Sequence, residues 1–177
     1  MTVPWVPKYF AKNLESLAKE LLPPKVYAKH GMQGLRMLDM DVVKFLDEFR
    51  YDCGVPLIVN TPWNGQFTQS CLRDEEMYGS FEKHFWSLSD HTRGAAIDVK
   101  CKHGGVWLRK KFLEREEYYF EKYGINFVEV GPVKKDNEWV EMSWAHFSRR
   151  WDFFGEVKYW SPKNGYVSKQ DVIDNNW

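Results

Sequence analysis

The order of apolar patterns along the chain is the feature that most limits how it can fold. Patterns of helical period come first, strand-like patterns come later, and a further helical pattern separates the strands. The expected helices cover residues 13–22, 40–54 and 106–124. The expected strands cover residues 55–60, 95–99, 125–131 and 138–148. Because strands and helices do not alternate regularly, the sequence predicts an α+β fold with a central, mostly antiparallel sheet flanked by helices.

Two connecting segments carry turn signals. Residues 61–80 contain Pro, Asn and Gly without any period, which predicts a long irregular loop. Loops of this length are unusual unless they have a function. Residues 132–137, with the sequence PVKKDN, predict a hairpin link between the last two strands.

The length of the chain indicates one domain. Its 177 residues, 44% of them hydrophobic, suffice for one buried core. We therefore expect a single domain over residues 1–177. The aromatic-rich tail at 151–177 is shorter than the ~40 residues below which domains rarely fold alone, so we expect it to pack on that domain.

Charge and cysteine content exclude several classes of protein. Lys and Arg number 25, as do Asp and Glu, so we expect no basic face and no nucleic-acid partner. Three widely spaced cysteines without a CxxC pair indicate reduced thiols rather than a disulfide framework or a thiolate zinc site. Neither a signal peptide nor a bilayer-spanning stretch is evident. We expect a monomer that is synthesised in the cytoplasm and does not insert into membranes.

The segment LSDHTRGAAIDV, residues 88–99, contains two side chains that can bind a metal. His91 and Asp98 are seven residues apart, but Gly94 and the β-branched residues after it disfavour a helix. The segment predicts a turn that carries His91, a hinge at Gly94 and a strand that presents Asp98. A catalytic zinc site needs three nitrogen or oxygen ligands at ~2.0 to 2.2 Å and one open position. Taken alone, the segment also fits a loop histidine followed by a solvated strand aspartate.

Ser89, His91, Gly94, Ala96 and Asp98 together give the pattern SxHxxGxAxD. This pattern resembles the signature of the zinc D-alanyl-D-alanine peptidase family. That family includes D,D-carboxypeptidases and phage L-alanyl-D-glutamate endopeptidases, and the hedgehog signalling domain shares its fold. The resemblance implies that His91 and Asp98 bind zinc, and it places Ser89 at the substrate.

The third zinc ligand of that family is a histidine on a strand near the end of the domain. The segment EMSWAHFS is similar to the WxHxS ending of many phage members, which implies that His146 is this ligand. Taken alone, a histidine in an aromatic strand also fits a core side chain. Cys101 and His103 offer another possible metal pair, although no second pair completes it.

The resemblance covers residues 20–146 and extends upstream of the motif. The segments PPKVYAKHG, PLIVN and SCLRD are similar to a subgroup common in phage genomes, with Cys71 where glycine is usual. In related peptidases an arginine before the zinc motif contacts the substrate and stabilises the developing oxyanion. The resemblance gives Arg73 both roles, whereas an arginine in a loop can also be merely solvated.

The general base is the point where the sequence departs from the family. Several members place a carboxylate three residues before the last histidine, and that position is Ser143 here. Glu141 is the nearest upstream carboxylate, but its odd separation from His146 puts the two on opposite faces of an unbroken strand. A bulge or turn at residues 142–143 would reverse this alternation. We predict Glu141 as the base, with a solvated strand carboxylate as the alternative.

These expectations combine into one function. The resemblance implies a zinc metallopeptidase that hydrolyses a peptide bond involving a D-amino acid in the stem peptide of peptidoglycan. Such an enzyme would act on the bacterial cell wall, as a phage lysin or cell-wall-degrading enzyme does. One alternative, favoured by Ser143, is a non-catalytic virion or binding protein that retains the fold and the metal. Another is an amidase that cuts the link between sugar and peptide.

Overall fold

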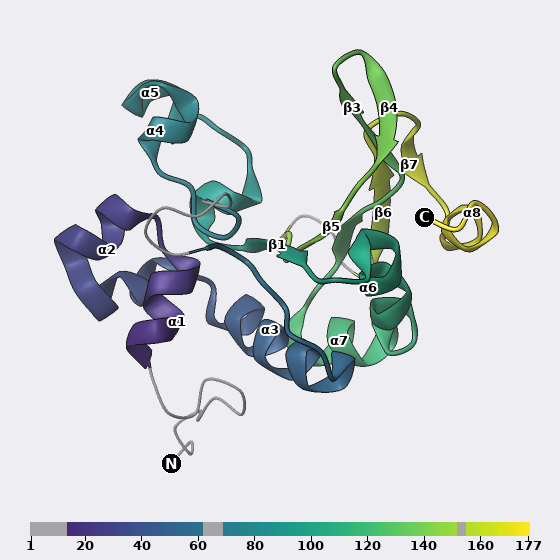
Figure 1. The fold of residues 1–177 in the computed structure, drawn as a ribbon, viewed down its shortest axis with the longest axis horizontal. Helices are drawn as coiled ribbons and strands as arrows, with labels where there is room; N and C mark the ends of the chain where they lie inside the picture. Colours follow the sequence, from purple (N-terminus) through teal and green to yellow (C-terminus); the bar gives the residue numbers. More distant parts are fainter. Residues whose placement is uncertain (1–13, 62–68, 152–154) are drawn as a thin grey trace.

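Helices from the first half of the chain pack beside a sheet from the second half in the computed structural model, which describes residues 14–61, 69–151 and 155–177 (Figure 1). The described α-helices are α1 (Leu14–Leu21), α2 (Pro24–His30), α3 (Met40–Cys53), α4 (Glu75–Tyr78), α5 (Phe81–Phe85), α6 (Gly104–Leu113), α7 (Glu116–Tyr123) and α8 (Lys169–Asp174). Two 3₁₀ helices are η1 (Gly31–Met37) and η2 (Asp90–Arg93). The described strands are β1 (Ala96–Lys100), β2 (Phe127–Glu129), β3 (Pro132–Lys135), β4 (Glu138–Glu141), β5 (Trp144–Ser148), β6 (Lys158–Ser161) and β7 (Gly165–Val167).

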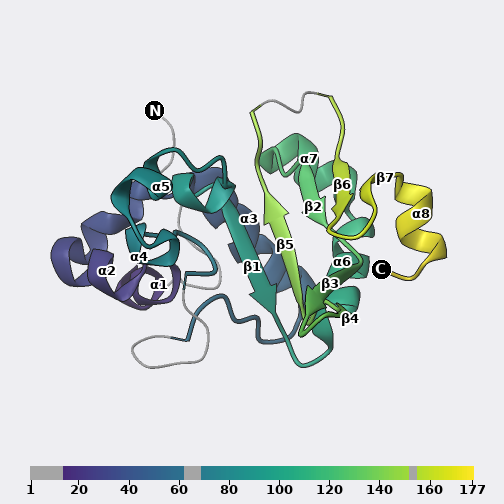
Figure 2. The same cartoon turned by 90° about the horizontal axis from the view of Figure 1, so that it is seen from above.

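The main sheet has the strand order β1-β5-β2-β6-β7 (Figure 2). Pairing is antiparallel between β1 and β5, between β5 and β2, and between β6 and β7, whereas β2 and β6 are parallel. Strands β3 and β4 form a separate hairpin. The predicted α+β fold with a mostly antiparallel sheet is confirmed. Strands β6 and β7 come from the C-terminal tail, which therefore completes the sheet.

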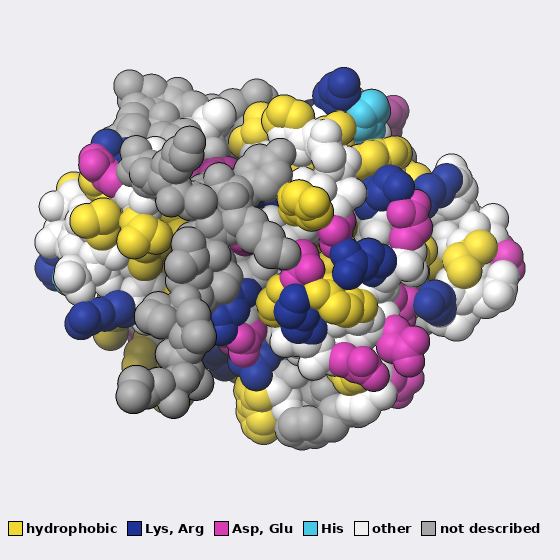
Figure 3. Space-filling view, turned by 90° about the horizontal axis from the view of Figure 1, so that it is seen from below, with side chains coloured by type: hydrophobic (Ala, Val, Ile, Leu, Met, Phe, Trp, Pro, Cys, Tyr) yellow, Lys and Arg dark blue, Asp and Glu magenta, His cyan; other side chains and the backbone are white. Residues whose placement is uncertain are grey.

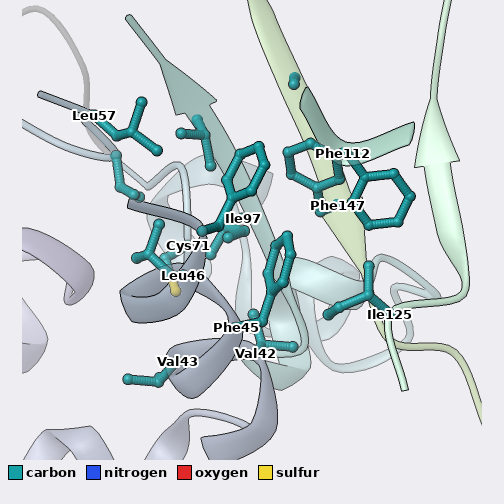
Figure 4. Packing of buried hydrophobic residues seen from close by; sticks show 14 of the residues in the cluster. Val42, Val43, Phe45, Leu46, Leu57, Cys71, Ile97, Phe112, Ile125 and Phe147 are labelled. Atoms are coloured by element: carbon teal, nitrogen blue, oxygen red, sulfur yellow. The ribbon is translucent and has the colours of Figure 1, made fainter. Parts of the chain in front are cut away.

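Helices α3, α6 and α7 cover one face of the sheet (Figure 2). Figure 4 shows core side chains of α3, α6 and the strands between them. Phe45 of α3 and Phe112 of α6 both pack against Phe147 of β5, with ring centroids 5.4 and 5.0 Å apart. All three side chains have no exposed surface. Burial of a phenylalanine contributes roughly 1.5 to 3 kcal/mol, so these contacts fix the position of β5 against the helices.

The register of the strands aligns one core-facing residue from each strand. These residues are Ile97, Phe147, Val128, Tyr159 and Val167. The first four are at most 3% exposed. Because side chains alternate along a strand, the next register position faces the opposite side of the sheet, away from this core.

The predicted strand at residues 55–60 is reduced to a single bridge. Ile58 and Lys100 exchange two backbone hydrogen bonds of 2.8 Å. Within the described part of this segment, the bridge does not extend into a ladder. Pro56 has no N–H to donate, which prevents the ladder from extending in that direction. The prediction of a regular strand here was wrong.

The predicted helix at residues 106–124 is two helices. Arg115, between α6 and α7, has φ −138° and ψ 26°, which is not a helical conformation. The second helix ends as predicted, because Gly124 takes the left-handed conformation at φ 68°. The break changes the direction of the chain before α7.

The predicted link and strand at residues 132–148 form a hairpin followed by a separate strand. The hairpin turns at Asp136 and Asn137, whose φ values of 49° and 67° suit a tight two-residue turn. The chain then leaves the strand conformation at residues 142–143, between β4 and β5. This is the interruption that would allow Glu141 to change its direction.

The predicted loop at residues 61–80 lies partly outside the described residues, which resume at 69. Its described portion includes the one-turn helix α4.

On the face shown in Figure 3, positive and negative side chains are interspersed. No helix within the described ranges is both long enough and apolar enough to cross a membrane.

Candidate metal centre

Two short elements deliver the first pair of predicted ligands. His91 lies in η2, and Asp98 lies in β1. Between them, Gly94 has φ 64°, and a Cβ atom there would lie 2.5 Å from the carbonyl oxygen of Met37 and 2.8 Å from Cα of Leu38. Both the left-handed backbone and this close approach require glycine. The turn, hinge and strand predicted from the sequence are all present.

The third predicted ligand comes from the neighbouring strand. His146 of β5 is the direct cross-strand partner of Asp98. Its Nδ1 lies 2.9 Å from Asp98 Oδ1 and 3.3 Å from His91 Nε2. One potential ligand atom from each of the three side chains lies within 4.8 Å of the others. This buried group can hold a metal ion, and its two imidazole nitrogens and one carboxylate are ligands that suit zinc among several divalent metals.

A backbone carbonyl orients the ring of His91. Nδ1 of His91 lies 2.8 Å from the carbonyl oxygen of Cys71. Because a carbonyl only accepts hydrogen bonds, Nδ1 carries the proton and Nε2 presents its lone pair to Asp98 and His146. Histidines that bind metals are held in the same way by a second hydrogen bond.

The charges of the three side chains are strongly coupled. Burial lowers the pKa of His91, which favours its neutral imidazole. Burial opposes ionisation of Asp98, but the two histidines outweigh it and hold the pKa of Asp98 well below its ordinary value. Burial also lowers the pKa of His146, yet its hydrogen bond to Asp98 and the nearby negative charges raise it overall. The group therefore attracts positive charge.

The three side chains line a pocket with a volume of about 440 Å³. The other lining residues are Arg73, Ser89, Phe127, Glu129, Trp144, Arg150, Trp160 and Tyr166. The side chains of Asp98 and His146 retain 15% and 10% of their exposure. The group that can hold a metal is thus largely buried but reached from the pocket.

Arg73 and Ser89, which the resemblance assigns to the substrate, both line this pocket. Arg73 Nη2 is 3.4 Å from Asp98 Oδ2, and its Nε donates to the carbonyl oxygen of Gln69 at 3.2 Å. Ser89 is the residue that precedes η2. Arg73 therefore presents its guanidinium beside the predicted metal ligands.

Glu141 lies elsewhere. Its carboxylate accepts a hydrogen bond from Arg109 of α6, which also donates to the carbonyl oxygen of Trp144 at 3.0 Å. The interruption at residues 142–143 exists, but Glu141 is paired with α6 and is not among the residues that line the pocket. The structure does not bring it to His146, so the geometry gives no support to Glu141 as the base.

A different carboxylate lies beside the metal-binding group. Glu129 of β2 is the cross-strand partner of His146 and lines the pocket. Directly opposite residues of this kind have Cβ atoms roughly 4.5 to 5.5 Å apart. Burial raises the pKa of Glu129, and the charge of Asp98 adds to the effect. Glu129 was not predicted from the sequence, although it is the one charged residue in the apolar segment INFVEVG.

The site residues of the sheet form one row across all five strands. In strand order they are Asp98, His146, Glu129, Trp160 and Tyr166. All five line the pocket. The row has the predicted metal ligands at the β1 end and aromatic side chains at the β7 end.

The remaining histidines that the structure describes are not part of this group. His84 Nε2 binds the carbonyl oxygen of Arg73 at 2.9 Å, and His103 packs beside Trp107 with ring centroids 4.8 Å apart. The alternative pair of Cys101 and His103 gains no third donor, because within the described ranges only one group brings three such side chains together.

Comparisons of the chain with family models, with curated proteins and with solved structures find no match.

Proposed function

We propose that this protein is a zinc-dependent peptidase that hydrolyses a peptide bond involving a D-amino acid in the stem peptide of peptidoglycan. The observation that carries the proposal is the convergence of His91, Asp98 and His146, whose ligand atoms lie within 4.8 Å of one another in a pocket. The substrate class rests on the resemblance of SxHxxGxAxD and WAHFS to the zinc D-alanyl-D-alanine peptidase family. Such an enzyme would act on the bacterial cell wall as a lysin.

The donor set fits zinc. Catalytic zinc sites commonly have three protein ligands drawn from histidine, carboxylate and thiolate, and an open fourth position. Here two histidines and one aspartate meet, and the Cys71 carbonyl fixes the tautomer of His91. Zinc bound by these residues would supply a Lewis acid that polarises the scissile carbonyl and lowers the pKa of water.

Glu129 is the carboxylate in position to move the proton. We assign it the role first predicted for Glu141, because it is in register with His146 and lines the pocket. In the proposed reaction the oxygen of water bonds to the carbonyl carbon, and Glu129 accepts the proton that water loses. The C–N bond then breaks, and Glu129 passes that proton to the leaving amine.

Arg73 is the positive group beside the reaction. Its guanidinium lies 3.4 Å from Asp98 at the wall of the pocket. A fixed cation in this position stabilises the negative charge that develops on the carbonyl oxygen when water adds. We therefore assign Arg73 to oxyanion stabilisation and Ser89 to contact with the substrate.

The non-catalytic alternative was favoured by Ser143, which stands where several related enzymes have a carboxylate. Glu129 offers a carboxylate from the adjacent strand. Ser143 therefore no longer argues against hydrolysis.

Digestion of purified cell wall tests the proposal. We expect clearing of a peptidoglycan zymogram, its loss on addition of a chelator and its return with zinc. Mass spectrometry of the released fragments should show a cut within the stem peptide. Failure to clear the wall with any divalent metal would overturn the proposal, and stems released with a free N-terminal alanine and no sugar would identify an amidase instead.

A further inference from the structure

The aromatic end of the row across the sheet has no role in the reaction described above. Trp160 of β6 and Tyr166 of β7 are direct cross-strand partners, and both line the pocket. Tyr166 is 61% exposed. A pair of aromatic side chains at the open end of a pocket is a surface on which a ligand can lie.

The geometry of the sheet sets the reach that this ligand needs. Neighbouring strands are roughly 4.8 Å apart, so β6 and β7 lie ~10 and ~14 Å from the strand of His146. An extended chain advances roughly 3.3 to 3.6 Å per residue. A substrate cleaved beside His146 must therefore continue for three or four residue lengths before it covers Trp160 and Tyr166.

The chemistry of this end favours a neutral ligand with one apolar face. The two arginines of the pocket have carboxylate partners: Arg73 pairs with Asp98, while Arg150 pairs with Asp90 and its Cζ lies 3.5 Å from the ring centre of Phe127. Indole and phenol rings have flat apolar faces and one polar group each. A sugar ring matches this surface, because its C–H face can stack on the aromatic rings while its hydroxyl groups remain in water.

We propose that Trp160 and Tyr166 form a subsite for a pyranose ring of the glycan to which the stem peptide is attached. This inference rests on the proposed function and adds to it that the protein recognises the glycan-linked stem rather than a free short peptide. The C-terminal tail supplies both rings, so it is part of the substrate site as well as of the sheet.

Binding to the metal-free full chain tests this subsite. The probes are a disaccharide-linked stem pentapeptide and the same pentapeptide without sugar, titrated by calorimetry after chelator treatment. We expect the native protein to bind the sugar-linked probe about fivefold more tightly. Tyr166→Ala and Trp160→Ala should remove this preference, and Trp160→Phe should keep most of it. Tyr51→Ala is the matched control, because Tyr51 is 66% exposed on α3.

Equal affinity of the native protein for the two probes would overturn the subsite. A loss in Tyr166→Ala that is the same for both probes would also overturn it, because the rings would then bind peptide. Thermal melting of each variant distinguishes lost binding from lost folding, and Tyr166→Ala removes an exposed ring with little risk to the core. Since these titrations need neither metal nor turnover, a wall that is not cleaved would defeat the proposed function alone.

Discussion

Two largely buried carboxylates, Glu48 and Asp98, differ in the chemistry of their neighbours. Three side chains of α7 donate hydrogen bonds to Glu48 of α3. Tyr118 and Lys122 donate hydrogen bonds of 2.7 and 2.8 Å, and Tyr123 donates a third. Burial raises the pKa of Glu48, but these donors outweigh it and lower the pKa to about 2. The protein itself satisfies this carboxylate.

The two side chains closest to Asp98 are the imidazoles of His91 and His146. The Nδ1 proton of His91 is committed to the Cys71 carbonyl, so the nitrogen that faces Asp98 has a lone pair. His146 Nδ1 donates to Asp98 Oδ1 at 2.9 Å, and Arg73 Nη2 donates to Oδ2 at 3.4 Å. Both carboxylates are largely buried and have a lowered pKa, so those two properties do not identify a site. The neighbours do, because an imidazole can give up its ring proton and bind a cation, whereas the lysine and phenol groups around Glu48 act as hydrogen-bond donors.

Removal of a ligand should give the largest effect. We expect His91→Ala to lose bound zinc and to lower cell-wall hydrolysis by at least ~10³-fold, about 4 kcal/mol of transition-state stabilisation. Metal analysis of the purified protein and a turbidity assay measure the two effects. His103→Ala is the matched control, since His103 is exposed and outside the group. Retention of one zinc per chain in His91→Ala would contradict the assignment.

Substitution of each candidate base in turn should give the next largest effect. Glu129→Gln should lower kcat by ~10²- to 10³-fold with its zinc content unchanged, because the amide cannot take the proton. Glu141→Gln should keep its kcat, since its amide oxygen can still accept from Arg109. Steady-state kinetics on soluble stem peptides measures both. The opposite pattern would return the role of base to Glu141.

Glu48→Gln should act on stability and leave the metal in place. The pKa of Glu48 is about 2 in the folded protein against an ordinary value of 4.5, so its ionisation stabilises the fold above pH 4.5. This contribution, at most about 3 kcal/mol, is lost as the pH falls from 4.5 towards 2. Urea denaturation should show that loss in the native protein and a flatter pH profile in the variant. Loss of zinc from Glu48→Gln would mean that Glu48 and the group of His91, Asp98 and His146 do not act independently.

Added zinc should stabilise the protein only by binding to the group of His91, Asp98 and His146. At a free zinc concentration 100 times Kd, binding adds ~2.7 kcal/mol to the free energy of unfolding. Glu48→Gln should keep this increment, and His91→Ala should lose it. Thermal unfolding with zinc and with chelator compares the three proteins. An increment that is the same in His91→Ala would mean that zinc binds elsewhere.

The sequence by itself determined the features that depend on neighbouring residues. The faces of α1 and α3 follow from apolar spacing, and the geometry from His91 to Asp98 follows from one left-handed glycine before a β-branched strand. His146 was predicted as the third ligand by resemblance to a known ending rather than by its spacing. These local conformations depend on adjacent residues, and contacts with distant parts of the chain did not override them.

Only the tertiary structure decided which side chains stand beside His146. Glu141 and Glu129 are both strand carboxylates, and their roles depend on whether each meets Arg109 or the pocket. Glu141 lies in the separate hairpin of β3 and β4, whereas Glu129 is placed by the register of β2 with β5, which is set where Phe147 and its cross-strand neighbours pack on the helices. A slip of one residue would turn every side chain of a strand to the other face, so burial of that core row also places Glu129 and the tail aromatics in line with Asp98 and His146.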